Sequence, residues 1–325
     1  MGYGLARVTV DGAPQVVLMR DDRYVPLANW GEARTFSALL ADWDAVLPKL
    51  QSWVADDAAF AGAPALDGAE VLMPYRPGQV FCTGANYKKH VVGLIMGDPS
   101  MRTPEYEAMA PEDLKARIEK MMDERAAGLP FAFLKLPASV VGPHDDVVLP
   151  YDVEKPDWEL ELGVVIGKRA HRVSADEAMD HVAGYAVVND VTARELIFRR
   201  DGSAIGADWL SGKSFPTFLP FGPLIVPRDQ VPNPYDLTLR LSVNGKVYQD
   251  ENTSDMMISI ERQIAYLASR CVLEPGDIIC TGSPYGNGSA FGVFLKPGDV
   301  MEAAIDGLGT QRNRCVAEAR GVSVS

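Results

Sequence analysis

The chain has 325 residues, 47% of them hydrophobic, and 31 Lys and Arg stand against 44 Asp and Glu, for a formal charge of −13. This length allows about two domains, or one large core with a smaller unit attached. The acidic balance argues against a nucleic-acid or anionic-membrane surface, because both require clustered basic residues. No apolar run reaches the ~18 residues of a membrane span. Four cysteines without a CxxC pair fit a reducing cytoplasm, so we expect a cytoplasmic protein with a small-molecule ligand.

The first 73 residues are expected to form a small β-rich N-terminal domain, followed by a catalytic domain over residues 74–325. Two short β-like runs flank the turn residues Asp11-Gly12, which predicts an antiparallel hairpin. A stripe of apolar residues at helical spacing follows. Pro48 lies in this stripe and is expected to kink the helix or to end its first part.

The segment over residues 91–130 is expected to form a lid over the site. It follows a buried strand candidate at residues 79–83 and is rich in Gly, Met and charged residues. Within it, residues 111–127 show the pattern of an amphipathic helix with proline at its first position. The glycines and prolines in the rest of the segment favour a mobile cover.

The C-terminal half reads mostly as strands and turns. Alternating apolar residues from Leu237 lead into Asn244-Gly245, a dipeptide that favours a type I′ hairpin turn. Two helices interrupt the strands. One begins with the capping box Ser174-x-x-Glu177, and the other carries apolar residues at helical spacing from Ile260.

Acidic residues give the strongest local signal. In the segment over residues 157–166, Asp157, Glu159 and Glu161 alternate and would share one face of a strand. Like charges beside an apolar stretch need a cation or exposure to water, and a solvated face is the simpler reading of E-x-E alone. Asp190 ends a second apolar strand, where its carboxylate either completes a site or caps the next turn. Three oxygen donors without His or Cys suit Mg²⁺, Mn²⁺ or Ca²⁺ rather than Zn²⁺.

Six short motifs, in order along about residues 78–305, resemble the fumarylacetoacetate hydrolase (FAH) family: Asn86-Tyr87-x-x-His90, Phe133-Leu134-Lys135, Glu159-Leu160-Glu161-Leu162-Gly163, Asn189-Asp190-Val191-Thr192-Ala193-Arg194, Gly212-Lys213-Ser214-Phe215 and Thr281-Gly282-Ser283-Pro284. Each motif is weak alone, but six in order are strong and outweigh the solvated-face reading. The resemblance implies an α+β fold with a rolled mixed β-core and peripheral helices, usually as a homodimer.

The resemblance also implies roles for individual residues. Mg²⁺ or Mn²⁺ would be held by the carboxylates of Glu159, Glu161 and Asp190. The catalytic residues would be His90, as the base that activates water, and Lys213. Substrate contacts would come from Tyr87, Lys135, Arg194 and Thr281, although Arg194 could instead brace Asp190.

These residues suggest a reaction. A divalent cation that chelates a 2-oxo acid makes the neighbouring C–C bond labile, and Lys213 adds positive charge where the oxyanion develops. We therefore expect a hydrolase that cleaves a C–C bond in an acylpyruvate or related 2,4-dioxo acid. The alternative is 2-oxo acid decarboxylation, isomerisation or dehydration, which the same chemistry supports. A non-catalytic binding scaffold is disfavoured, because it would not need Lys213 and His90.

Two positions depart from the family pattern. Family hydrolases commonly carry a Glu three residues after the His, where this chain has Gly93. Either His90 acts without a carboxylate partner, or one comes from the lid, with the candidates Glu105, Glu107 and Glu112. The family also often places Gln seven residues after the metal-binding Asp, where Ile197 stands. Both changes predict a less polar pocket or a reaction that needs no activated water.

Overall fold

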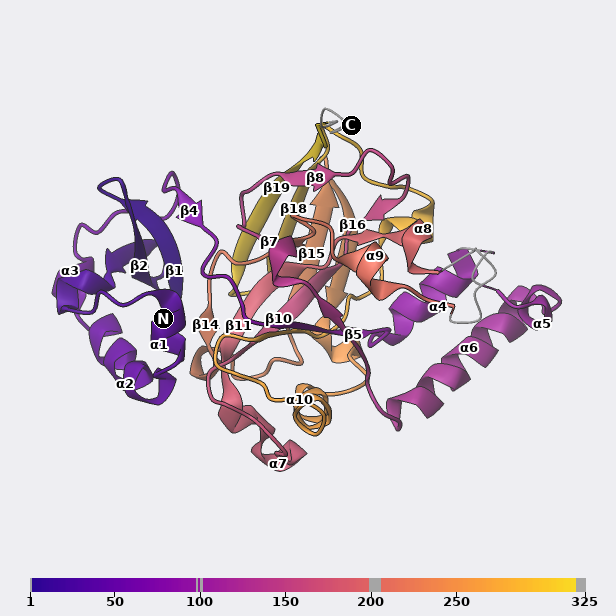
Figure 1. Ribbon diagram of the computed structural model, residues 1–325, viewed down its shortest axis with the longest axis horizontal. Helices are drawn as coiled ribbons and strands as arrows, with labels where there is room; N and C mark the ends of the chain where they lie inside the picture. Colours follow the sequence, from indigo (N-terminus) through magenta and orange to yellow (C-terminus); the bar gives the residue numbers. More distant parts are fainter. Residues whose placement is uncertain (1, 98, 100–101, 199–205, 320–325) are drawn as a thin grey trace, which may run out of the picture.

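A four-stranded antiparallel sheet forms the N-terminal part of the computed structural model, which describes residues 2–97, 99, 102–198 and 206–319. Its strand order is β3-β2-β1-β4, with helices α1 to α3 beside it in Figure 1. The elements are β1 (Tyr3–Val10), β2 (Ala13–Arg20), β3 (Arg23–Pro26), α1 (Phe36–Leu40), α2 (Trp43–Val54), α3 (Asp57–Phe60) and β4 (Val71–Leu72). Asp11 and Gly12 have φ values of 51° and 78°, as the predicted tight turn between β1 and β2 requires.

Pro48 does not end the helix, and the kink predicted as the other outcome stays a prediction. Pro48 lies inside α2, and the helical stripe breaks earlier, between α1 and α2. The carbonyl of Asp42 accepts hydrogen bonds from the backbone N–H groups of Ala45 and Val46, so a new helix begins there. Burial of one face of α2 in the core then holds this helix together despite the bond that proline cannot donate.

Two larger sheets form the centre of the molecule. The six-stranded sheet has the order β14-β11-β10-β17-β5-β6, and the five-stranded sheet has the order β16-β15-β18-β19-β8. Their strands are β5 (Val80–Gly84), β6 (Phe131–Lys135), β8 (Val147–Leu149), β10 (Leu160–Ile166), β11 (Val182–Asn189), β14 (Val226–Pro227), β15 (Thr238–Val243), β16 (Lys246–Asn252), β17 (Ile278–Cys280), β18 (Val300–Ile305) and β19 (Gly309–Ala317). Most neighbours are antiparallel, while the β17–β5 and β19–β8 pairs are parallel.

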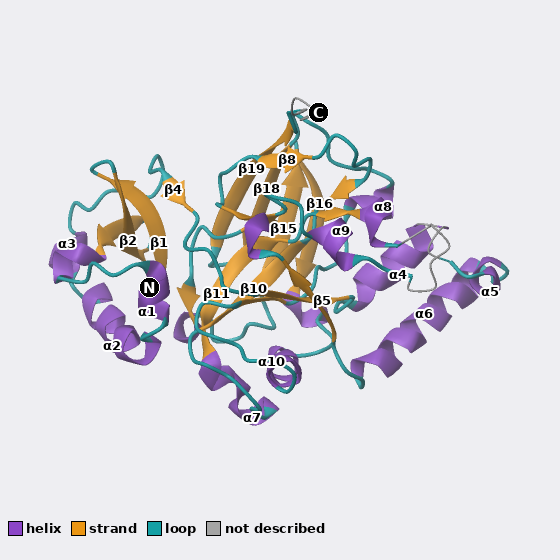
Figure 2. Cartoon of the chain, in the orientation of Figure 1, coloured by secondary structure: helices purple, strands orange, loops and turns teal. Residues whose placement is uncertain are grey.

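Four shorter strands form two further pairs. These are β7 (Val140–Val141) with β13 (Leu219–Pro220), and β9 (Pro156–Asp157) with β12 (Thr192–Ala193). The predicted hairpin turn at Asn244-Gly245 is confirmed between β15 and β16, with both residues at positive φ. The peripheral helices of this part are α7 (Ala175–Ala178), α8 (Arg194–Ile197), α9 (Trp209–Lys213) and α10 (Ile260–Ala268), and Figure 2 shows helices around a central mass of strands. The α+β fold with a rolled mixed β-core is confirmed.

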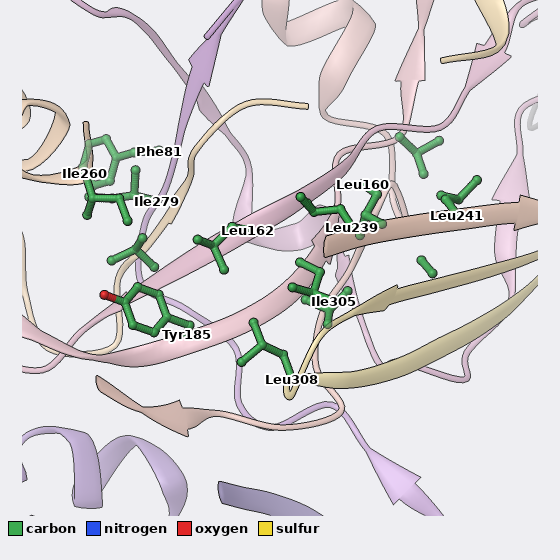
Figure 3. Close-up of a cluster of buried hydrophobic side chains, with 14 of the residues drawn as sticks. Phe81, Leu160, Leu162, Tyr185, Leu239, Leu241, Ile260, Ile279, Ile305 and Leu308 are labelled. Atoms are coloured by element: carbon green, nitrogen blue, oxygen red, sulfur yellow. The ribbon is translucent and has the colours of Figure 1, made fainter. Parts of the chain in front are cut away.

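Side chains from both large sheets share one buried core. Figure 3 shows Leu160, Leu162 and Tyr185 of the six-stranded sheet near Leu239 and Ile305 of the five-stranded sheet. A second buried cluster joins α1 and α2 to the other face of the six-stranded sheet. Residue 73 therefore separates two sheets along the chain, but it does not separate two independent cores.

Residues 91–130 fold as a helical arm that projects from the β-core on the side away from the N-terminal sheet (Figure 1). The arm comprises α4 (Lys88–Gly97), α5 (Pro104–Glu107) and α6 (Pro111–Ala126), while residues 98, 100 and 101 lie outside the described residues. Its small core consists of Ile95, Leu114, Ile118 and Met122. Arg262 of α10 donates hydrogen bonds to the carbonyls of Ala126 and Gly128, at 2.6 and 2.5 Å, and so holds the end of α6. Movement of this arm as a lid stays a prediction.

Among the helices that the structure describes, none combines the length and apolar character needed to cross a membrane.

Candidate metal centre and active site

Three carboxylates converge where β10 and β11 run side by side. Glu161 belongs to β10, Glu159 directly precedes that strand, and Asp190 directly follows β11. The backbone N–H of Asp190 donates to the carbonyl of Glu159 at 2.8 Å, and the Asn189 side chain accepts from the Glu159 backbone at 2.9 Å. One oxygen from each carboxylate lies within 4.8 Å of the other two, and all three side chains are buried. The strand register thus assembles a cluster of hard oxygen donors.

The third acidic residue of the predicted strand points elsewhere. Residues 158–159 interrupt the strand between β9 and β10, so Asp157 does not join the cluster. Its carboxylate accepts hydrogen bonds from the backbone N–H groups of Gly288 at 2.6 Å and Ser289 at 3.1 Å. It also pairs with Arg194 at 2.7 Å. Asp157 therefore braces a loop and an arginine beside the cluster.

Three cations compensate much of this negative charge. Lys213 Nζ contacts Glu159 and lies 2.5 Å from Asp190 Oδ2, and Arg194 Nη2 lies 2.5 Å from Glu159 Oε1. Behind the cluster, Lys135 Nζ lies 2.5 Å from Asp190 Oδ1. Burial acts to raise the pKa of Glu159, but Arg194, Lys213 and His90 outweigh it and hold that pKa below its usual range. Burial also acts to lower the pKa of Lys213, but Asp190 and Glu159 raise it, so this lysine stays charged.

Glu161 differs from the other two carboxylates. It accepts a hydrogen bond from the backbone N–H of Gly282 at 2.7 Å, and no ion pair joins it to a cation of the described chain. Burial, followed by Asp190, Cys280 and Glu159, raises its pKa well above the usual value. A buried carboxylate without a cation is costly as an anion. The donor set therefore fits a hard divalent cation, which would supply the missing positive charge.

His90 faces the same cavity from α4 with a buried, neutral imidazole. Burial is the main cause that lowers its pKa to about 4. Its Nδ1 is buried and has no hydrogen-bond partner among the described residues. The lid carboxylates do not supply one, because the side chains of Glu105, Glu107 and Glu112 are exposed and none of them lines the cavity. Among the described residues, no carboxylate forms a hydrogen bond with His90, and Glu159 and Asp157 act on it through their charge alone.

The cavity in front of these groups has a volume of about 340 Å³. The three carboxylates, His90, Lys213 and Arg194 line it. Much of the remaining wall is apolar and comes from Val91, Leu94, Ile95, Phe131, Phe133, Ile197, Phe198, Trp209 and Phe294. Ile197 stands where the family pattern has a polar side chain. It packs against the backbone of Gly212: a Cβ added at Gly212 would lie 2.3 Å from the Ile197 side chain. A pocket of low polarity results.

Three of the predicted substrate-binding residues do not line this cavity. Lys135 lies behind Asp190, and its Nζ also donates to the carbonyl of Val191 at 2.9 Å. The hydroxyl of Thr281 donates to the carbonyl of Leu162 at 2.9 Å. Tyr87 is fully buried in the wall, and its hydroxyl has no partner among the described residues. These side chains support the site from behind in this structure.

Two further cationic residues line the cavity, and no sequence pattern predicted their place there. Arg125 stands at the end of α6, and Lys155 precedes β9. Neither belongs to a motif, and each is brought to the wall by the folding of a distant segment. The alternation of Phe131 and Phe133 along β6 was the available signal for the aromatic wall, because alternate strand residues share a face.

Lys135→Met should weaken metal binding without weakening substrate binding. Removal of the ammonium group frees Asp190 from its support, and loss of a residue that holds a metal ligand costs about 10–100-fold in metal affinity. Calorimetric titration with Mg²⁺ or Mn²⁺ measures this loss, with Lys88→Met, which removes an exposed pair with Asp123, as the control. A raised KM at saturating metal, with normal metal affinity, would instead place Lys135 at the substrate.

A rolled β-core that carries a buried cluster of three carboxylates, a charged lysine and a neutral histidine around one cavity defines the class of this protein. It is an enzyme with a site suited to a divalent metal ion. Residues 79–316 match the family described as fumarylacetoacetate (FAA) hydrolase, C-terminal. The chain belongs to this family.

Known members show which proteins this chain resembles. It is 38% identical over 268 residues to the human mitochondrial oxaloacetate tautomerase FAHD2A, covering 81% of this chain and 75% of the relative. The fumarylacetoacetate hydrolase of Exiguobacterium antarcticum superposes with a TM-score of 0.74 at 27% identity, covering 97% and 100% of the two chains. Maleylpyruvate hydrolase of Sphingobium sp. SYK-6, solved with manganese(II) and pyruvate, gives 0.69 at 25% identity, covering 97% and 100%.

Proposed function

We propose that this protein is a Mg²⁺- or Mn²⁺-dependent tautomerase or isomerase of a 2-oxo acid. The observation that carries the proposal is the state of His90, which is neutral, buried and without a hydrogen-bonded carboxylate among the described residues. The activity named for the human relative, oxaloacetate tautomerase, supports the same reaction class. This proposal takes the alternative that the sequence left open and places it ahead of C–C hydrolysis.

The acid–base chemistry of His90 favours proton transfer at carbon over water activation. An imidazole with a pKa of about 4 is a weak base toward water, because burial outweighs the charges of Glu159 and Asp157, which favour its protonated form. A divalent cation bound at the carboxylate cluster would polarise the keto group and carboxylate of a 2-oxo acid and so acidify the adjacent C–H. A weak base is sufficient to remove such a proton.

The residues of this chain complete the proposed proton transfer. His90 removes a proton from the carbon next to the keto group; the electron pair of that C–H bond forms a C=C double bond, and the π pair of the C=O bond moves to the keto oxygen. Lys213, which stays charged, stabilises the negative charge on that oxygen. The protonated His90 then gives the proton to the oxygen, which yields the enol and restores the neutral imidazole. Arg194 lines the cavity and can hold the substrate carboxylate.

One experiment separates the two reaction classes. Purified protein with Mg²⁺ is incubated with oxaloacetate and a panel of acylpyruvates in ¹⁸O-labelled deuterated water. We expect fast deuterium exchange next to the keto group and fast decay of the enol, without release of a carboxylic acid. Release of pyruvate together with an ¹⁸O-labelled acid would contradict the proposal and establish hydrolysis, the activity that the name of the Sphingobium neighbour states for that protein.

The substrate is proposed to carry a second negative group. Arg125 lines the otherwise apolar side of the cavity; it donates to the carbonyl of Gly84 at 3.2 Å and lies over the ring of Phe131, with no carboxylate partner among the described residues. Burial lowers its pKa, and no carboxylate of the described residues pairs with the guanidinium to oppose this effect. A carboxylate at the far end of a 2-oxo diacid would provide that charge.

Arg125→Gln should therefore raise KM for 2-oxo diacids by about 10–100-fold, the worth of one hydrogen bond to a charged group, and leave kcat nearly unchanged. Steady-state kinetics on a diacid and on a monoacid of equal length measure the effect. Arg117→Gln, an exposed arginine on the same helix, is the matched control. Equal changes in KM for both substrates would contradict a role in binding the second carboxylate.

A homodimer is proposed for the assembly. Large apolar side chains are exposed on β6, its flanking residues and the adjoining α9, with exposed fractions of 68% for Leu129, 58% for Leu134, 46% for Leu136 and 60% for Leu210. A second copy of the chain would cover them. Sedimentation should give twice the chain mass for the wild type and the mass of one chain for Leu134→Asp. A monomeric wild type would contradict the proposal.

A further inference from the structure

The loop over residues 285–291 packs directly against one face of α4. His90, Gly93 and Gly97 share this face, because their spacing corresponds to successive helical turns. A Cβ added at Gly93 would lie 2.3 Å from the ring of Tyr285, and one added at Gly97 would lie 3.0 Å from the carbonyl oxygen of Ala290. The two glycines therefore allow the loop to lie against the helix.

This contact places Asn287 beside His90. Asn287 stands between Tyr285 and Ala290 in the loop. Its side chain is within interaction distance of the His90 imidazole and acts to raise the pKa of that histidine. Two buried polar atoms here have no hydrogen-bond partner among the described residues: Nδ1 of His90 and Oδ1 of Asn287. Buried polar atoms are rarely left unpaired, since each costs about 1–3 kcal/mol.

The amide of Asn287 has a fixed orientation. Its Nδ2 donates to the carbonyl of Trp158 at 2.8 Å and to the hydroxyl of Ser283 at 3.3 Å. A carbonyl oxygen can only accept, so Oδ1 and Nδ2 cannot exchange places. Oδ1 is consequently a hydrogen-bond acceptor without a donor among the described residues. A neutral imidazole protonated at Nδ1 provides such a donor.

We infer that Asn287 is the positioning residue of His90. In the proposed arrangement its Oδ1 accepts a hydrogen bond from Nδ1–H, which fixes this tautomer and leaves Nε2 free to take the substrate proton. Tyr285 fills the space above Gly93 and excludes a carboxylate from the partner position. An amide stabilises a protonated imidazole less than a carboxylate does, which suits a weak base. The inference rests on the proposed role of His90.

A pair of variants isolates the acceptor. Asn287→Asp and Asn287→Leu both lose the N–H groups that bond Trp158 and Ser283, but only Asn287→Leu loses the oxygen that faces His90. We expect Asn287→Leu to lower kcat about 10–100-fold at unchanged KM, by analogy with residues that orient a liganding histidine, and Asn287→Asp to stay within a few-fold of wild type. Equal losses in both variants would mean that Asn287 only braces the loop.

A spectroscopic measurement tests the tautomer without reference to the reaction. In ¹⁵N-histidine-labelled protein, with His90 assigned by His90→Gln, wild type and Asn287→Asp should show a protonated Nδ1, and Asn287→Leu should lose this preference. A wild-type His90 protonated at Nε2 would overturn the inference. If Nδ1 is protonated as expected while the substrate panel reveals hydrolysis, the proposed function fails and the inference stands.

A rescue variant tests the exclusion of the carboxylate. Gly93→Glu alone should unfold or inactivate the protein, because its side chain would overlap the ring of Tyr285. Gly93→Glu with Tyr285→Gly opens the space and places a carboxylate one turn from His90. Added to Asn287→Leu, this pair should restore kcat toward the wild-type value. A folded triple variant no faster than Asn287→Leu would contradict the need for an acceptor at Nδ1.

Discussion

Glu161→Gln should abolish metal binding and lower turnover more than about 100-fold, while the metal-free protein becomes no less stable. Removal of a ligand should weaken metal binding by more than the factor of about 10–100 that is typical when a residue supporting a ligand is changed. The metal-free protein tolerates the change because no cation of the described residues forms an ion pair with Glu161, and burial raises its pKa. A neutral amide of the same shape removes that cost and can still accept the N–H of Gly282. Titration calorimetry and melting curves with Mg²⁺ or chelator measure both effects.

Glu159→Gln is the informative contrast. In the metal-free protein Glu159 pairs with the buried Lys213 and the largely buried Arg194, so its neutralisation removes one of the two carboxylate partners of each cation and leaves only Asp190 and Asp157. Loss of one member of a buried ion pair costs about 3–5 kcal/mol, and this variant should melt earlier even in chelator. Equal melting shifts for the two variants in chelator would contradict the charge distribution seen in the cluster.

The raised pKa of Glu161 makes the stability of the metal-free protein depend on pH. The pKa of Glu161 is raised above its usual value of 4.5, so the folded protein binds more protons than the unfolded chain, and stability of the metal-free protein falls as pH rises from there. Glu161→Gln should therefore gain most over wild type at high pH. Metal binding must displace this proton, so affinity for Mg²⁺ should rise with pH.

His90→Ala should lower kcat by about 10²–10⁴-fold and leave metal affinity nearly unchanged, because the imidazole is proposed as the base and is not among the clustered oxygen donors. Its pKa is lowered from 6.5 to about 4, mainly by burial, so at saturating metal the wild-type rate should stay constant down to about pH 5. Rate profiles from pH 4 to 8 test this, with the exposed His171→Gln as control. A near wild-type rate for His90→Ala would exclude this histidine as the base.

The lowered pKa of His90 also makes the folded protein less stable at acidic pH. Between its folded pKa of about 4 and its usual value of 6.5, His90 is neutral in the folded protein and protonated in the unfolded chain. The unfolded state then binds more protons, so the free energy of unfolding falls as pH falls through this window. His90→Gln should remove this part of the acid sensitivity, which chemical denaturation at pH 5 and pH 7 measures.

The sequence by itself determined the local elements and identified the three candidate metal ligands. Asp11-Gly12 and Asn244-Gly245 tolerate positive φ, so they specify tight turns whatever surrounds them, and the capping box at Ser174 is present. Glu159, Glu161 and Asp190 were recognisable from their short motifs and the family resemblance, and the register of two antiparallel strands brings them together. Such features depend on residues a few positions apart or on one strand pair.

Only the tertiary structure decided what surrounds those ligands. Tyr285 meets Gly93, Arg262 holds the end of α6, and Asp157 anchors residues 288–289, in each case across more than 100 positions of the chain. No local sequence pattern specifies such contacts, because they depend on how loops and helices pack against the folded core. The same holds for Lys135, whose motif predicted substrate contact but whose strand places the side chain behind Asp190. Sequence periodicity specifies which face of an element is buried, whereas packing specifies which distant residue it meets.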